Sequence, residues 1–143
     1  MPDKHKPEII AFPNCPALLP ITNDKWQVDD NYSAVIYTGQ TVSIKKGIET
    51  DGASIPRICW RVIGHPFMLP ILPCALVHDA LYAAELLARN ECDWAFLCLM
   101  QSAGIGWFKR NTVYSAVRAG GAFVWGKHTV KSICDARKFC KIK

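Results

Sequence analysis

The sequence lacks the segments that mark membrane-spanning and secreted chains. Its longest apolar run covers residues 67–77, is interrupted by Pro70 and Pro73, and is shorter than the roughly twenty residues that a helix needs to cross a bilayer. The charged residues 1–7 are not followed by the hydrophobic region of a signal peptide. We therefore expect a chain with no signal peptide and no transmembrane helix, made and folded in the cytoplasm.

The sequence also lacks a CxxC pair, although it contains seven cysteines. A zinc ribbon, which is built from such pairs, is therefore not expected. Cys74, Cys92 and Cys98 lie at helical positions that should face inward, where a cysteine packs as a small hydrophobic residue. In the cytoplasm these side chains remain free thiols. A disulfide between Cys74 and Cys98 is the alternative if the protein is released from the cell.

Acidic residues are scarce at the C-terminal end, where Asp135 is the only one after residue 126. Residues 127–143 therefore carry the whole net charge of +5, and the rest of the chain is balanced. A chain of 143 residues with 50% hydrophobic residues is expected to form one domain with its own core. We divide it into a proline-rich extended segment at 1–25, a single globular domain at 26–126, and a basic tail or helix at 127–143.

The order of the predicted elements indicates an α+β fold that is mainly helical. Two β-rich runs, 32–37 and 41–44, flank turn residues and predict a hairpin. After Pro56, helical patterns occupy 58–63, 73–84, 90–103 and 109–124, and Asn90 is the predicted N-cap of the third of these helices. We expect an N-terminal β hairpin followed by a bundle of about four helices.

A histidine, two aspartates and a tyrosine mark the two middle helices. His78 and Tyr82 are four residues apart and share a helical face, with Asp79 beside them. Asp93 follows His78 by fifteen residues, so a reversal near Glu85 makes the two neighbours across an antiparallel helix pair. A histidine oriented by one carboxylate, next to another that can hold a cation, can turn water into a nucleophile. Alternatively, Asp93 stabilises the first turn of its helix or joins a structural polar network.

A turn that precedes the helices offers oxygen ligands. Asp51 stands before Gly52, Ser54 follows, and Pro56 ends the stretch. Small side chains leave backbone carbonyls uncovered, as a cation site built from oxygen ligands requires. Asp51, Gly52 and Ser54 are therefore candidate metal ligands. The alternative is a loop at the end of a strand, in which Asp51 caps backbone amides.

Several short motifs follow one another between residues 26 and 121. They are Thr50-Asp51-Gly52-Ala53-Ser54-Ile55-Pro56-Arg57, Trp60, His78-Asp79-x-x-Tyr82, Arg89-x-x-x-Asp93 and Tyr114-x-Ala116-Val117-Arg118-x-Gly120. Together they resemble a family of small phage and prophage proteins that is described only as a domain of unknown function. The resemblance implies a phage- or prophage-encoded protein, made in the cytoplasm of a bacterial host and in some cases associated with the virion. It brings no activity with it.

The predicted helix pair resembles, more distantly, that of secreted phospholipase A2 enzymes. Those enzymes carry C-C-x-x-H-D-x-C-Y on one helix and C-D-x-x-A on its antiparallel partner, which this chain matches at Cys74, His78, Asp79, Tyr82, Cys92, Asp93 and Ala95. The resemblance implies that His78 is the general base, that Asp93 holds its tautomer, and that Tyr82 supports Asp93. It further implies that Asp79 is a ligand of Ca²⁺, which would polarise an ester carbonyl.

The chain departs from the phospholipase pattern at several positions. One cysteine of the paired cysteines is Ala75, and Leu81 stands before Tyr82. The glycine-rich calcium loop is missing, so only the turn at 51–54 could replace it. Because a shared fold does not establish a shared function, the helix pair can also be a convergent arrangement.

Two classes of function therefore remain open. The first is a calcium-assisted ester hydrolase of the phospholipase A2 type, with a phospholipid or membrane surface as the partner of the basic tail. The second is a non-catalytic phage accessory protein, such as a tail or morphogenesis component or an inhibitor of a host defence system, which binds a host or phage protein. A peptidoglycan or nucleic-acid hydrolase is a third option, nucleic acid is the weaker candidate partner, and the oligomeric state is left open.

Overall fold

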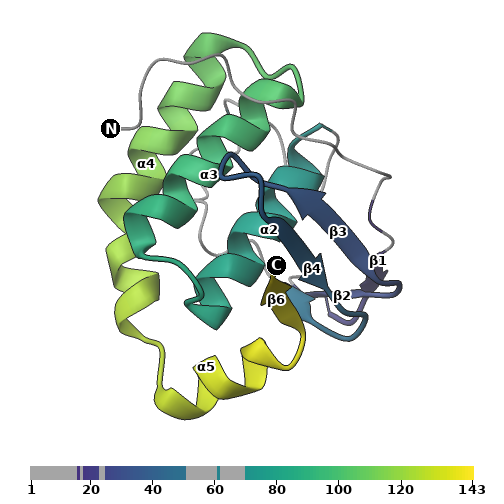
Figure 1. The fold of residues 1–143 in the computed structure, drawn as a ribbon. Helices are drawn as coiled ribbons and strands as arrows, with labels where there is room; N and C mark the ends of the chain where they lie inside the picture. Colours follow the sequence, from purple (N-terminus) through teal and green to yellow (C-terminus); the bar gives the residue numbers. More distant parts are fainter. Residues whose placement is uncertain (1–15, 17, 23–24, 51–60, 62–69) are drawn as a thin grey trace.

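The computed structural model describes residue 16 and residues 18–22, 25–50, 61 and 70–143. Within these residues, short strands lie on one side of a group of helices, and helix α2 lies between the strands and the outer helices (Figure 1). The predicted α+β class, with strands in the N-terminal part and helices after them, is confirmed. No described helix combines the length and the apolar character needed to cross a bilayer.

One three-stranded sheet contains the predicted hairpin. Strands β3 (Tyr32–Val35) and β4 (Thr41–Ile44) pair antiparallel, with Tyr32 opposite Ile44 and Val35 opposite Thr41. Residues alternate between buried and half-buried along both strands, as expected of a sheet with one face on the core. Gly39 has a φ of 81° in the connecting turn, a conformation that glycine adopts without steric cost.

The third strand of this sheet comes from the other end of the chain. Strand β6 (Cys140–Ile142) pairs antiparallel with β4 and places the buried Cys140 opposite Ile44. Helix α5 (Val130–Arg137) precedes it. Residues 127–143, for which the sequence predicts a basic tail or helix, thus contain α5 and also a strand that was not predicted. Lysines surround the residues of β6 and no turn residues precede them, so the local sequence does not predict a strand there. They form a strand because they pair with β4.

A second sheet brings the N-terminal region to the body of the molecule. Its order is β1 (Leu18–Pro20), β2 (Trp26–Val28) and β5 (Glu49–Thr50), all antiparallel. Strand β1 lies in the segment predicted to be extended. Strand β5 ends at Thr50, which is buried and faces helix α2 through its side chain.

Three of the predicted helices are confirmed to within two residues at each boundary. They are α2 (Ile71–Ala84), α3 (Arg89–Ser102) and α4 (Trp107–Gly126). The predicted N-cap of α3 is wrong, because Asn90 lies in the first turn of a helix that begins at Arg89. The Glu91 carboxylate accepts a hydrogen bond of 2.9 Å from the Ala88 amide and satisfies the helix start instead. The predicted helix at 58–63 falls outside the described residues, apart from Arg61.

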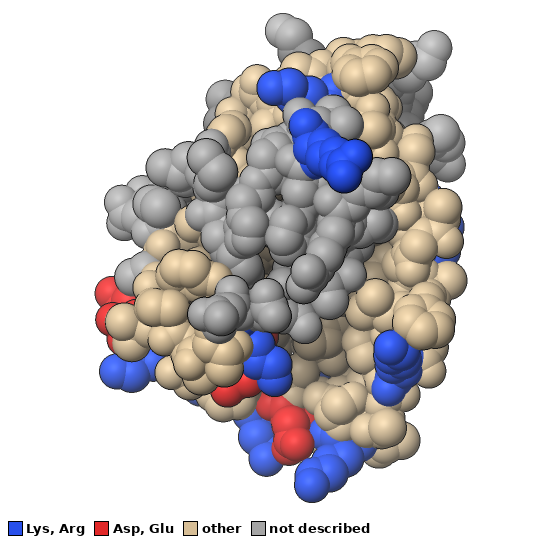
Figure 2. Space-filling view, turned by 180° about the vertical axis from the view of Figure 1, so that it is seen from behind, with Lys and Arg blue, Asp and Glu red and all other residues tan. Residues whose placement is uncertain are grey.

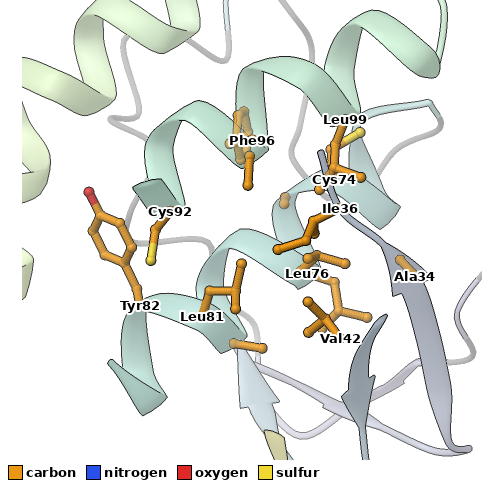
Figure 3. Packing of buried hydrophobic residues seen from close by; sticks show 14 of the residues in the cluster. Ala34, Ile36, Val42, Cys74, Leu76, Leu81, Tyr82, Cys92, Phe96 and Leu99 are labelled. Carbon is orange, nitrogen blue, oxygen red and sulfur yellow. The ribbon is translucent and has the colours of Figure 1, made fainter. Parts of the chain in front are cut away.

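Helix α2 forms the centre of the core. A helix that is apolar on all sides is stable only when other elements surround it, and α2 contacts α3, α5 and the strands. Figure 3 shows side chains from the three layers gathered in one cluster: Ile36 and Val42 from the hairpin, Leu76 and Leu81 from α2, and Phe96 and Leu99 from α3. Burying each such side chain contributes about 1.5–3 kcal/mol, so this cluster determines how α2 and α3 are placed.

The described cysteines, Cys74, Cys92, Cys98, Cys134 and Cys140, are free thiols. The alternative disulfide between Cys74 and Cys98 is not formed, and both side chains are buried as predicted. Burial raises the pKa of Cys74 and of Cys92 to about 12, because a thiolate loses its hydration in the core. These cysteines therefore act as small hydrophobic residues and not as nucleophiles.

The chain reverses between α2 and α3 at residues 85–88, inside the interval that the sequence predicts. Glu85 closes α2 in the left-handed conformation, with a φ of 44°. Arg137 of α5 donates to the carbonyl oxygens of Ala84 and Glu85 at 2.7 and 3.0 Å, and His128 Nδ1 lies 2.8 Å from Glu85 Oε1. Cationic side chains at the last carbonyls of a helix are favourable, so the C-terminal segment helps to hold this reversal.

Candidate functional site

The structure brings His78 and Asp93 together across the antiparallel helices α2 and α3. His78 Nε2 lies 2.8 Å from Asp93 Oδ1, and both residues have no exposed surface. The predicted contact between these two residues is therefore confirmed. It depends on the short reversal at 85–88, which places residues fifteen positions apart at the same level of the helix pair.

Asp93 has further partners on both carboxylate oxygens. The Tyr82 hydroxyl donates to Oδ1 at 2.6 Å, which is the contact that the resemblance to phospholipase A2 implies. Arg118 of α4 donates from Nη1 to Oδ2 at 2.7 Å, and Arg89 Nη1 lies 3.5 Å from the same oxygen. Arg89 also donates to the Arg118 carbonyl oxygen at 3.3 Å. Asp93 thus joins three helices in one polar network.

The network keeps Asp93 ionised despite its burial. Burial alone would raise the pKa of Asp93, but hydrogen bonds from His78, Tyr82 and Arg118 outweigh it and hold the pKa below its usual value. The hydrogen bond to Asp93 raises the pKa of Arg118, and burial raises the pKa of Tyr82 far above neutrality. At neutral pH, Asp93 is therefore an anion between a cationic arginine and a neutral phenol.

An ionised Asp93 determines how the imidazole of His78 is protonated. A carboxylate can only accept hydrogen bonds, so Nε2 carries the proton that lies between His78 and Asp93. In the neutral imidazole the lone pair is then on Nδ1, which is 3.9 Å from Asp79 Oδ1. That distance is too long for a hydrogen bond. In its neutral form, His78 therefore carries its lone pair on the ring nitrogen that faces Asp79.

Asp79 is held from the sheet. The Thr50 hydroxyl of β5 donates to Asp79 Oδ2 at 2.6 Å, across 29 positions of sequence. The Asp79 side chain keeps 14% of its surface exposed, whereas the His78 side chain keeps none. The Asp79 side chain is thus nearer to solvent than the imidazole beside it. Sequence analysis missed the role of Thr50, although it stands immediately before the predicted ligand turn.

Aromatic rings hold the imidazole in place. The centroid of the His78 ring is 4.3 Å from that of Tyr82 and 4.6 Å from that of Phe96. Helix α4 approaches closely at Gly121, where an added Cβ would lie 2.5 Å from the Tyr82 hydroxyl oxygen and 3.2 Å from Arg89 Nη1. Glycine at position 121 therefore allows α4 to pack against the network.

The structure tests the predicted calcium ligands only in part. Asp51, Gly52 and Ser54 lie outside the described residues. Among the residues that are described, no group of three or more His, Cys, Asp or Glu side chains could hold a metal ion. Calcium takes six to eight oxygen ligands. In the described part of the chain the carboxylate of Asp79 is the candidate ligand, and by itself it does not form a calcium site.

Two arginines of the network were not assigned a role from the sequence. The spacing of Arg89 and Asp93 is i, i+4 on one helix, which is a sequence signal for an ion pair. Arg118 has no such signal, because it reaches Asp93 from a helix that begins fourteen residues later in the chain. Both arginines stand in the motifs on which the predicted resemblance rests.

Comparison with known proteins places the chain in a family. The family described as "Protein of unknown function (DUF1353)" matches residues 26–117, more than half of the chain, so the chain belongs to it. The "Uncharacterized protein y4jT" of Sinorhizobium fredii (strain NBRC 101917 / NGR234) is 30% identical over 78 residues, which cover 54% of this chain and 23% of that relative. No solved structure matches the chain.

The family match confirms the predicted membership of a family of unknown function. The matched range includes Thr50, His78, Asp79, Tyr82, Arg89 and Asp93, and ends one residue before Arg118. The chain spans less than a quarter of the length of the relative from Sinorhizobium fredii. The phage origin and the activity remain predictions.

Proposed function

We propose that this member of the family is an ester hydrolase, most simply of phospholipids, in which His78 activates water. The observation that carries the proposal is the bond of 2.8 Å between His78 Nε2 and an ionised Asp93. A histidine oriented in this way is a suitable general base near neutral pH. Asp79 Oδ1 lies 3.9 Å from the other ring nitrogen, and we propose that this carboxylate offers a polar place for water or for a substrate.

In the proposed reaction, His78 Nδ1 takes a proton from water while the water oxygen attacks the ester carbonyl carbon. Asp93 stabilises the imidazolium that forms, as a buried carboxylate does for a catalytic histidine. When the tetrahedral intermediate collapses, the bond to the alcohol oxygen breaks and the imidazolium returns its proton to that oxygen. The products are an acid and an alcohol, and His78 regains its starting tautomer.

Calcium is the proposed cofactor. Asp79 would supply a carboxylate ligand, and Asp51, Gly52 and Ser54 are the proposed additional donors. A bound cation would polarise the ester carbonyl and stabilise the developing oxyanion. Titration calorimetry of the full chain with calcium, and with magnesium and zinc for comparison, tests this part. A thermal shift with calcium that is lost in Asp79→Asn supports it, because a ligand that binds only the native state raises the melting temperature.

A second function has an observation in its favour. His78 and Asp93 have no exposed surface, and both oxygens of Asp93 have partners within the protein. Such a network can serve to fix the register of packed helices. The chain would then be a non-catalytic phage or prophage accessory protein, such as a tail or morphogenesis component or an inhibitor of a host defence system, with a host or phage protein as its partner.

Hydrolysis assays separate the two functions. We expect the purified chain to hydrolyse a phospholipid or an activated ester, and His78→Ala to lower kcat about 10²–10⁴-fold. The matched control is His128→Ala, which removes the other histidine that lies 2.8 Å from a carboxylate, and it should leave kcat unchanged. Asp93→Asn should lower kcat by favouring the wrong tautomer, and Tyr82→Phe should lower it far less. Wild-type protein without activity on either substrate would favour the non-catalytic function.

A further inference from the structure

The outer face of α4 is exposed and nearly without charge. Phe108 and Phe123 keep 69% and 70% of their surface exposed, which is unusual for residues of this size. They are fifteen positions apart, so they lie about 22 Å from each other along the helix and about 60° apart around it. Ser115, Ala119 and Ala122 lie between them on the same side and are also exposed.

Basic residues flank this face. Lys109 and Lys127 follow Phe108 and Phe123 by one and four positions, and both are exposed. The Lys127 ammonium lies 4.1 Å from the centre of the Phe123 ring. Arg118, which is the only charged residue between Arg110 and Lys127, bonds to Asp93 and keeps 35% of its side chain exposed. The outward charges at the two ends of this face are therefore lysines.

Acidic residues are missing from this part of the chain. The sequence contains no Asp or Glu from Trp94 to Cys134, but it contains five Lys or Arg there: Lys109, Arg110, Arg118, Lys127 and Lys131. Seen from behind, the edge of the molecule along α4 shows tan and blue atoms and no red (Figure 2). Two exposed phenylalanines with lysines beside them, in a stretch of sequence without Asp or Glu, complement an apolar layer beneath an anionic surface.

We propose that the outer face of α4 docks on the surface of an anionic lipid bilayer. The two phenylalanines enter the interface, the small residues between them allow the helix to lie flat, and Lys109 and Lys127 contact the headgroups. The inference deepens the proposed function, from which it takes a phospholipid as the substrate. It differs from membrane contact through the basic tail, because only Lys127 is common to both surfaces.

Two other occupants of this face fit less well. In an antiparallel two-fold pair of chains packed through α4, the same flank of each helix lies on one side, so Lys109 of each copy would lie near Lys127 of the other and repel it. Nucleic acid needs donors to phosphate along the contact, and the exposed residues on this side of the helix, Ser115, Ala119 and Ala122, offer a single hydroxyl.

Vesicle sedimentation tests the docking surface without requiring catalysis. We expect the full chain to sediment with vesicles of phosphatidylcholine mixed with phosphatidylglycerol, and much less with phosphatidylcholine alone. Phe108→Ser combined with Phe123→Ser should weaken partitioning about a hundredfold. Lys109→Gln combined with Lys127→Gln should weaken it about thirtyfold. The control for the phenylalanines is Leu19→Ser combined with Ile21→Ser, because these residues are 47% and 46% exposed on the other side of the molecule. The control for the lysines is Lys45→Gln combined with Lys46→Gln. Each of the two double variants should bind vesicles like wild type.

Three results would overturn the docking proposal. In the first, wild-type protein stays in the supernatant with both vesicle types. In the second, the control variants lose as much binding as the α4 variants. In the third, light scattering shows a dimer that only the phenylalanine variants dissociate. Failure of the proposed function is a separate outcome. Protein that sediments with anionic vesicles but hydrolyses no lipid would remove the hydrolase and leave the docking surface in place.

Discussion

Two histidine–carboxylate pairs lie at opposite ends of the last two turns of α2. The distance between the ring nitrogen and the carboxylate oxygen is the same in both. His78 Nε2 is 2.8 Å from Asp93 Oδ1, and His128 Nδ1 is 2.8 Å from Glu85 Oε1. The side chains of the first pair have no exposed surface, whereas those of the second keep 15% and 23%. Asp93 is also bonded to Tyr82 and Arg118. The two pairs therefore differ in their surroundings and not in their distance.

The difference shows why distance alone does not identify a functional histidine. A pair that reaches solvent is screened and contributes little free energy of unfolding. A buried pair costs free energy to desolvate and is stable only when its remaining hydrogen-bonding groups also find partners. Asp93 meets that condition with donors from three helices, so removing it affects more of the molecule than removing Glu85.

The largest expected effect comes from deleting the two carboxylates in turn. Asp93→Ala leaves His78, Tyr82 and Arg118 without an acceptor, and we expect it to lower the free energy of unfolding by about 3 kcal/mol. Glu85→Ala should lower it by about 0.5 kcal/mol, because the pair with His128 is partly exposed. Urea unfolding followed by circular dichroism measures both. Equal losses would show that the buried network is no stronger than the surface pair.

A smaller effect is expected from two glycines of α4. Gly121→Ala places a Cβ against the Tyr82 hydroxyl, so it should displace α4 or Tyr82 and cost about 2 kcal/mol. Gly126→Ala is the matched control, because no atom lies within 4 Å of its added Cβ and alanine favours the helix. It should be neutral or slightly stabilising. Melting temperatures of the two variants check this, and a Gly121→Ala protein as stable as Gly126→Ala would contradict the close approach.

The smallest effect is expected from pH and is confined to the acid range. The pKa of Asp93 in the folded protein is below its usual value of 3.8, so its ionised form stabilises the fold above that pH. This contribution is lost as the pH falls through the folded pKa. The stability difference between wild type and Asp93→Asn should therefore be constant from about pH 7 to 5 and shrink below about pH 4. Urea unfolding at several pH values tests it, and a difference that persists at low pH would argue against an ionised Asp93.

Much of the fold could be predicted because the signals are local. The hairpin of β3 and β4 follows from two β-rich runs around turn residues, and the three long helices follow from the helical patterns after Pro56. The contact of His78 with Asp93 follows from a spacing that a short reversal can close. The place of Tyr82 on the same face as His78 follows because residues four apart share a helix face. Each of these inferences needed only the geometry of one element or of two consecutive elements.

The parts that could not be predicted depend on contacts between distant segments. Thr50 reaches Asp79 across 29 positions, and Arg118 reaches Asp93 across 25. Strand β6 exists because β4 offers an edge to pair with, and Gly121 is required only where α4 passes Tyr82. The sequence by itself thus determined which residues could form a histidine–aspartate pair and on which helices. Only the tertiary structure decided the burial and the charge of that pair, because both depend on what the rest of the chain packs around it.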